Sequence, residues 1–184
     1  AINMLESIGN SQYHSMQTSL RVTRFKNVMI NGNYTWARQM DNGTDVRNAL
    51  PANSYNLRRE YGPGAVDLRH IFTGYVSYDL PKFTEKAKRL LTGWQFNSLF
   101  TAHTGGTLDI TAGRQISNSF DNRDRVDVVG SANPGIGTPL TPGGAVPYFS
   151  PSAFAFPASG TFGNIGRNAL RGPGFNAVDF SIFK

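Results

Sequence analysis

The chain has 184 residues, of which 39% are hydrophobic and only 16% are charged, and it carries 20 glycines and 10 prolines. It has no cysteine, which excludes disulfides, thiol catalysis and thiolate metal sites. The net charge of +6 comes from lysines and arginines that are scattered singly or in pairs, whereas a nucleic-acid surface needs clustered positive charge.

Alternation of apolar and polar residues predicts four strands, at 13–25, 28–39, 67–80 and 94–102. We expect the first and second strands to pair as an antiparallel hairpin, and the third and fourth likewise, with the hairpins adjacent in one meander. Alternation predicts a fifth strand at 178–183. The only helical signal, at 83–91, allows a turn or two.

The predicted connections alternate in length. Links within each hairpin are short, whereas long loops cover residues near 40–66 and 104–176. This asymmetry is typical of an outer-membrane barrel, whose strands need only about 10 alternating residues each. The sequence therefore predicts an all-β fold over 1–184, a single segment of an outer-membrane-type barrel or of a β-rich assembly built from it. A soluble β-sandwich is the alternative.

The strand pattern separates two sets of residues. One set is expected to face lipid or to be packed, and it comprises Leu20, Val22, Tyr34, Trp36, Phe72, Val76, Phe96 and Phe100. The other is expected to line a wet lumen, and it comprises Gln17, Ser19, Arg21, Asn31, Asn33, Thr73, Gln95 and Asn97.

Chemical motifs are weak. His14, His70 and His103 lack metal-ligand spacing, and the glycines of "GTFGNIGRN" (160–168) lack the strand and helix context of a phosphate loop. The charge run "DNRDR" (121–125) is expected to be solvated. We expect no catalytic residues, no metal site, no cofactor and no enzymatic activity.

The chain resembles the C-terminal barrel region of TonB-dependent receptors of the Oar-like type. The resemblance covers nearly the whole chain in order, from "NSQYHSMQTSLRVTRF" through "DLRHIFTGYVSYDLP" to "FSPSAFAFPASGTFGNIGRNALRGPGFNAVDFSIFK". It implies a fragment of an outer-membrane transporter that imports a ligand. TonB would act only through a plug that this chain lacks, and in that family further hairpins follow the last strand.

The resemblance leaves two functions open. Either the chain is part of such a receptor, or it is a structural subunit of a self-assembling extracellular β-rich filament or tube. Its expected partners are outer-membrane lipid and either the remaining barrel strands or further copies of itself, and not nucleic acid. The expected location is the outer membrane or cell surface of a Gram-negative bacterium. The strand order of the family implies that the strand with Val178, Phe180 and Ile182 pairs on one side with the strand at 94–102. In both readings its other edge needs a further strand beside it.

Overall fold

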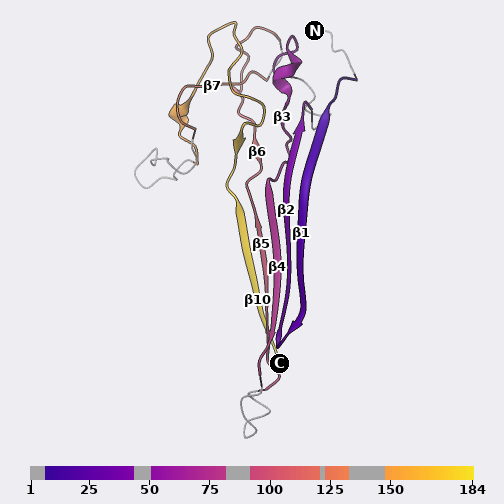
Figure 1. Ribbon diagram of the computed structural model, residues 1–184. Helices are drawn as coiled ribbons and strands as arrows, with labels where there is room; N and C mark the ends of the chain where they lie inside the picture. Colours follow the sequence, from indigo (N-terminus) through magenta and orange to yellow (C-terminus); the bar gives the residue numbers. More distant parts are fainter. Residues whose placement is uncertain (1–6, 44–50, 82–91, 121–122, 133–147) are drawn as a thin grey trace, which may run out of the picture. The chain divides into compact units, whose positions relative to one another are not determined.

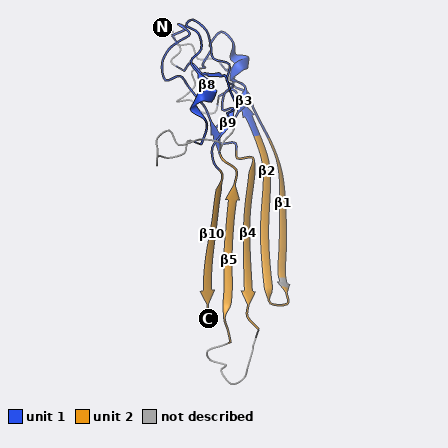
Figure 2. Ribbon diagram, turned by 90° about the vertical axis from the view of Figure 1, so that its left-hand side faces the viewer, with its two compact units in different colours: residues 1–13, 39–67, 106–173 blue, residues 14–38, 68–105, 174–184 orange. Residues whose placement is uncertain are grey.

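The computed structural model describes residues 7–43, 51–81, 92–120, 123–132 and 148–184. The chain divides into two compact units (Figure 2): one comprises residues 1–13, 39–67 and 106–173, and the other residues 14–38, 68–105 and 174–184. The regular elements of the described residues are strands and two short 3-10 helices, Leu57–Glu60 and Pro151–Ala153. The all-β prediction is confirmed.

The main sheet is an antiparallel meander (Figure 1). Its strands follow the order β1 (Ser11–Phe25), β2 (Val28–Asp41), β4 (His70–Asp79), β5 (Gln95–His103) and β10 (Phe175–Phe183). The pairs β2 with β4, β4 with β5 and β5 with β10 are all antiparallel. The predicted adjacency of the two hairpins and the pairing of the terminal strand with β5 are therefore confirmed.

Several strand ends differ from the prediction. The predicted third strand starts at residue 67, whereas β4 starts at His70, because the Asp67 carboxylate accepts a hydrogen bond from the Gln39 backbone N–H at 2.7 Å instead of continuing the strand. The second strand continues to Asp41, where it pairs with β3 (Gly62–Pro63). The last strand begins at Phe175, earlier than predicted. The helical turn expected at 83–91 lies outside the described residues.

The connections between the strands of the main sheet alternate in length. β1 and β2 are joined through residues 26–27, where Lys26 has a φ of 56° that suits a tight hairpin, and β4 and β5 through residues 80–94. The connections 42–69 and 104–174 are long and contain small strand pairs of their own. These pairs are β6 (Thr107–Leu108) with β9 (Leu170–Arg171), and β7 (Asp127–Val128) with β8 (Phe154–Ala155).

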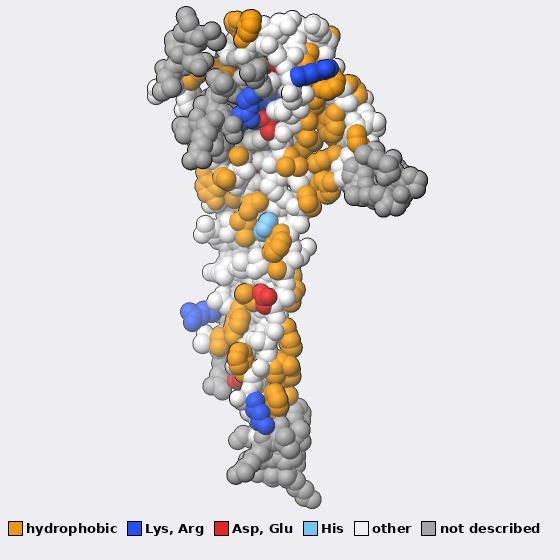
Figure 3. Space-filling view, turned by 180° about the vertical axis from the view of Figure 1, so that it is seen from behind, with side chains coloured by type: hydrophobic (Ala, Val, Ile, Leu, Met, Phe, Trp, Pro, Cys, Tyr) orange, Lys and Arg blue, Asp and Glu red, His pale blue; other side chains and the backbone are white. Residues whose placement is uncertain are grey.

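Burial is inverted relative to a soluble globular domain. Of the described side chains, the largest that are fully buried are Asp41, Asp67 and Asp124. Large apolar side chains of the sheet are exposed instead, including Leu20 at 60% and Val178 at 64%. Along the strands, hydrophobic and uncharged side chains cover most of the surface in Figure 3, with isolated charges. Such extended apolar exposure indicates a lipid or protein partner.

Candidate functional site

One face of the main sheet carries most of its large apolar side chains. Residues aligned by the antiparallel register share a face, and alternation along each strand connects the aligned rows. We call this side the apolar face. Each of its rows takes one residue from β2, β4, β5 and β10, in that order. The first row is Tyr34, Phe72, Ala102 and Asn176, the second Gly32, Gly74, Phe100 and Val178, the third Ile30, Val76, Ser98 and Phe180, and the fourth Val28, Tyr78, Phe96 and Ile182. Trp36 and His70 form one further row.

Aromatic side chains occupy both ends of the apolar face. At the end of the long connections, the Tyr34 hydroxyl and His70 Nδ1 share a hydrogen bond of 2.7 Å, and Trp36 lies opposite His70. At the other end the face carries Tyr78, and the Lys184 ammonium lies 5.3 Å from the centre of the Trp94 ring. Aromatic rings with polar tips suit the two interfaces of a membrane.

The distance between these aromatic ends fits a bilayer. Residues 70 to 78 of β4 span about 27 Å at about 3.4 Å per residue. A strand tilted by about 40° projects this length to about 21 Å, close to the apolar band of roughly 25 Å that outer-membrane barrels present to lipid.

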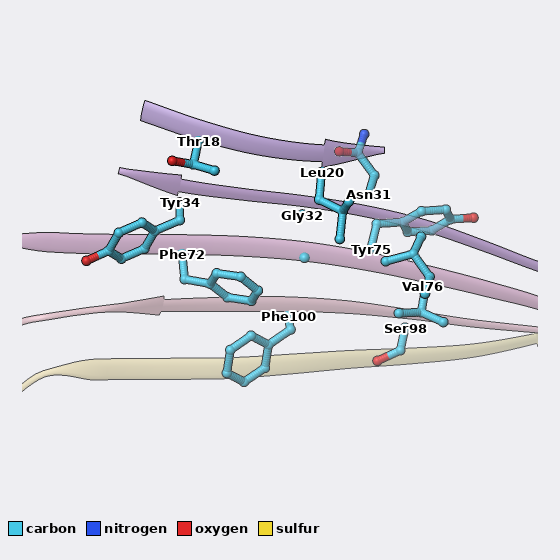
Figure 4. A pocket seen from close by; sticks show the side chains of 12 residues that line it. Thr18, Leu20, Asn31, Gly32, Tyr34, Phe72, Tyr75, Val76, Ser98 and Phe100 are labelled. Carbon is cyan, nitrogen blue, oxygen red and sulfur yellow. The ribbon is translucent and has the colours of Figure 1, made fainter. Parts of the chain in front are cut away.

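A groove lies within the apolar face. Its volume is about 340 Å³, and its lining includes Leu20, Ile30, Tyr34, Phe72, Val76 and Phe100 (Figure 4). Gly32 and Gly74 lie opposite each other across β2 and β4. A Cβ added at Gly32 would meet nothing within 4 Å, whereas one at Gly74 would lie 3.1 Å from the Phe72 ring. The missing side chain at Gly32 therefore leaves open space between aromatic and aliphatic side chains.

The opposite face, the polar face, carries the other predicted set on β2, β4 and β5. Asn31 is aligned with Tyr75, Asn33 with Thr73, Ser77 with Asn97, and Asp79 with Gln95. The Tyr75 hydroxyl donates to Asn97 Oδ1 at 2.7 Å, which explains an aromatic residue among polar ones. Apolar exceptions include Met29, aligned with Ser77, and Ile71 and Leu99, aligned with His103 and Tyr75 respectively.

Strand β1 follows the same division. Thr18 and Leu20 line the groove with Gly32, so alternation along β1 puts Val22 on the apolar face. The same alternation puts on the polar face Gln17, Ser19 and Arg21. The two predicted sets thus lie on opposite faces; which face meets lipid and which meets water stays a prediction.

In the other unit, a buried arginine joins segments distant in sequence. Arg125 donates to both carboxylate oxygens of Glu60, at 3.1 and 2.6 Å, and its Nε donates to Asp109 at 3.2 Å. The Arg125 and Glu60 side chains are only 7% and 6% exposed. The expectation that 121–125 is a solvated charge run is wrong for Asp124 and Arg125, because both are buried with partners. The Asp124 carboxylate accepts hydrogen bonds from the Ser117 backbone N–H and hydroxyl, and Arg125 pairs with Glu60.

Two further arginines form ion pairs with aspartates at strand ends: Asp41 is the last residue of β2, and Asp67 precedes β4. Arg167 donates to the Asp41 carboxylate at 2.5 Å and to its backbone carbonyl at 2.8 Å. Arg171 pairs with the Asp67 carboxylate and donates to its backbone carbonyl at 2.9 Å. Removal of one partner from such a pair leaves a buried charge uncompensated. These ion pairs therefore fix how the two long connections pack together.

Residues 160–168 form part of this packing. The backbone N–H and the side-chain amide of Asn164 bond to residues of β7, the N–H donating to Asp127 Oδ1 at 2.7 Å. A Cβ at Gly163 would collide with the backbone carbonyls of Arg125 and Val126, so only glycine fits there. Gly163 of this motif thus permits close backbone contact in a loop.

The three histidines do not converge. His70 lies on the apolar face, whereas His103 lies on the polar face and its Nδ1 is 3.0 Å from the Thr104 carbonyl oxygen. Among the described residues, no group of three or more histidine or carboxylate side chains could hold a metal ion. The same part of the chain contains no helix that is long and apolar enough to cross a membrane.

A family model, described as an outer membrane beta barrel domain, matches residues 1–184. The chain belongs to this family. No curated protein and no solved structure matches it significantly. The chain is therefore part of an outer-membrane barrel protein, and membrane lipid is the environment of its strands.

Sequence reasoning missed the buried carboxylates and their arginine partners. Arg167 lies within the glycine motif, but nothing in the local pattern indicates that its partner is Asp41, because the pairing depends on how two long connections pack.

Proposed function

We propose that the chain forms part of the barrel wall of a TonB-dependent receptor that imports a ligand across the outer membrane of a Gram-negative bacterium. The observation that carries this proposal is the two-faced sheet. An apolar face with aromatic ends suits lipid, and a face of amides and hydroxyls suits a water-filled or plugged lumen. The resemblance to Oar-like receptors supplies the specific class.

The polar face supports a lumen that makes hydrogen bonds and carries few charges. Its β2, β4 and β5 residues include the amides of Asn31, Asn33, Gln95 and Asn97, and Asn97 Nδ2 lies 3.4 Å from Gln95 Oε1. Amide and hydroxyl groups can exchange partners with a plug or with a polar ligand. We infer that this face contacts polar groups without strong selection by charge.

The long connections are the proposed ligand-binding region. In outer-membrane barrels the long loops face the outside, and the short turns face the periplasm. Buried ion pairs such as Arg125 with Glu60 hold together the described parts of the connections that carry them, which lowers the entropic cost of binding there. We propose a transport role for this chain and no catalytic one.

The second candidate is a structural subunit of a β-rich filament or tube. It is favoured by the edge of the sheet: among the described residues, no strand pairs with the outer side of β10, on which Val178 is 64% and Phe180 63% exposed. In the receptor, a further barrel strand would occupy this edge. In the filament, a second copy would.

The mass and the TonB affinity of the native polypeptide that carries residues 1–184 distinguish the two candidates. The receptor requires a mass several times 20.1 kDa and saturable binding to the purified periplasmic domain of TonB. A mass near 20.1 kDa, no TonB binding and filaments in electron micrographs would overturn the receptor and support the assembly.

A further inference from the structure

Basic side chains lie on the apolar face, beyond the Tyr34 end of the groove. Alternation along β2 places Arg38 on the same face as Tyr34 and Trp36, at the end from which a long connection leaves. His70 of β4 and His14 of β1 share this end of the face by the same alternation. We call these residues, Arg38, His14 and His70, the basic end of the groove.

Arg125, Arg167 and Arg171, with their carboxylate partners in the long connections, form what we call the loop cluster. Arg38 differs from these arginines. Arg125 and Arg167 are buried in ion pairs. Arg38 is exposed, and within the described ranges its guanidinium has no hydrogen bond or ion pair. A guanidinium is the side chain best suited to hold a phosphate through paired hydrogen bonds. Arg38 is thus available to an anion from outside the chain.

The spacing between groove and basic end matches one lipid leaflet. Residues 32 to 38 of β2 span about 20 Å along the strand, or about 15 Å along the membrane normal at a tilt of about 40°. Half of a bilayer's hydrocarbon core is about 15 Å. A lipid with its phosphate at Arg38 would therefore lay its acyl chain along the face as far as the open space at Gly32.

We propose that this strip of the apolar face is a binding site for one anionic, phosphate-bearing membrane lipid. The acyl chain occupies the groove at Gly32, and the phosphate accepts hydrogen bonds from Arg38, with ring N–H groups of His14 and His70 beside it. The proposal rests on the proposed orientation, in which the apolar face meets lipid and the long connections face outward. Lipid is the occupant, because the groove is apolar, the chain belongs to an outer-membrane family, and the charge of the basic end complements a phosphate.

The test uses photoreactive lipids with the native polypeptide that carries residues 1–184. The protein is reconstituted in phosphatidylcholine vesicles that contain a small fraction of either phosphatidylglycerol or phosphatidylcholine with a diazirine on the acyl chain. After illumination, mass spectrometry of peptides from β2 and β4 gives the yield of lipid adducts. We expect the phosphatidylglycerol probe to label the groove about fivefold more than the phosphatidylcholine probe, the factor that one arginine near a membrane surface contributes.

Four variants separate the contributions of the arginine and of the groove. Arg38→Gln should abolish the preference for phosphatidylglycerol, and Arg38→Lys should retain most of it. Arg21→Gln, which removes an exposed arginine from the polar face, should leave it unchanged. Gly32→Leu, which fills the open space, should lower labelling by both probes.

The outcomes also separate this proposal from the proposed function. Equal labelling by both probes, unchanged in Arg38→Gln, would overturn the lipid site while leaving the apolar face in lipid. Labelling of neither probe on the apolar face would overturn the orientation itself. If 10 mM inorganic phosphate abolished the preference, the basic end would bind a soluble anion, and the lipid proposal would be wrong.

Discussion

A charge on the apolar face should cost far more than the same charge on the polar face. The test replaces Val76, which is 42% exposed on the apolar face, and Asn31, which is exposed on the polar face one residue away in register. The row of Gly74 lies midway between the aromatic ends, so Val76 is one row from the middle, or about 5 Å along the membrane normal.

An arginine costs about 2 to 4 kcal/mol at the membrane midplane and about 0 to 1 near the interfaces, roughly 12 Å away. Val76→Arg should therefore cost about 2 kcal/mol, a change of about 30-fold in the unfolding equilibrium constant. Asn31→Arg should change the free energy of unfolding by no more than about 0.5 kcal/mol. Urea unfolding of the native polypeptide in lipid vesicles, followed by tryptophan fluorescence, measures both. The reasoning is refuted if Asn31→Arg costs as much as Val76→Arg.

Two further predictions concern the loop cluster. Arg125→Met should destabilise the loop cluster by about 3 to 5 kcal/mol, because Glu60 stays buried without its partner. The double variant Arg125→Met with Glu60→Gln should recover part of this loss. Hydrogen exchange of residues 106–120 measures the stability of the cluster, and equal protection in all variants would contradict the prediction. Gly163→Ala should cost more than about 2 kcal/mol in urea unfolding, because its Cβ meets backbone carbonyls, whereas Gly166→Ala, whose Cβ has no neighbour nearer than 3.9 Å, should stay within about 0.5 kcal/mol. Equal costs for the two alanine variants would argue against close packing at Gly163.

The strands of the main sheet could be predicted from sequence, because the alternation that determines their faces lies within each strand. A side-chain period of two fixes which residues share a face, so Phe72 and Val76 fall together without knowledge of any distant residue. Short links then predict the pairing of β1 with β2 and of β4 with β5. The adjacency of these hairpins follows from the tendency of consecutive elements to lie side by side, and the pairing of β5 with β10 follows from the strand order of the family that the chain resembles.

The loop cluster could not be predicted, because its ion pairs join residues that are far apart in the sequence. Asp67 continues the alternating pattern of the next strand, yet Arg171 and the Gln39 backbone N–H hold its carboxylate outside that strand. The run 121–125 looks solvated, since nothing near it in sequence indicates that Glu60 will neutralise Arg125. Partners more than 60 residues apart are determined by the packing of the long connections, which period and turn signals do not encode.

The central claim concerns strands β1, β2, β4, β5 and β10 of the main sheet: their even-numbered residues meet lipid and their odd-numbered residues meet water. Residues 1–184 contain no cysteine, so single cysteines placed in turn at 16–22 of β1 can each carry a spin label in the native polypeptide in vesicles. We predict that accessibility to oxygen, which concentrates in lipid, peaks at 16, 18, 20 and 22, and that accessibility to a water-soluble nickel complex peaks at 17, 19 and 21. Equal oxygen accessibility at both sets, or the opposite alternation, would contradict the claim.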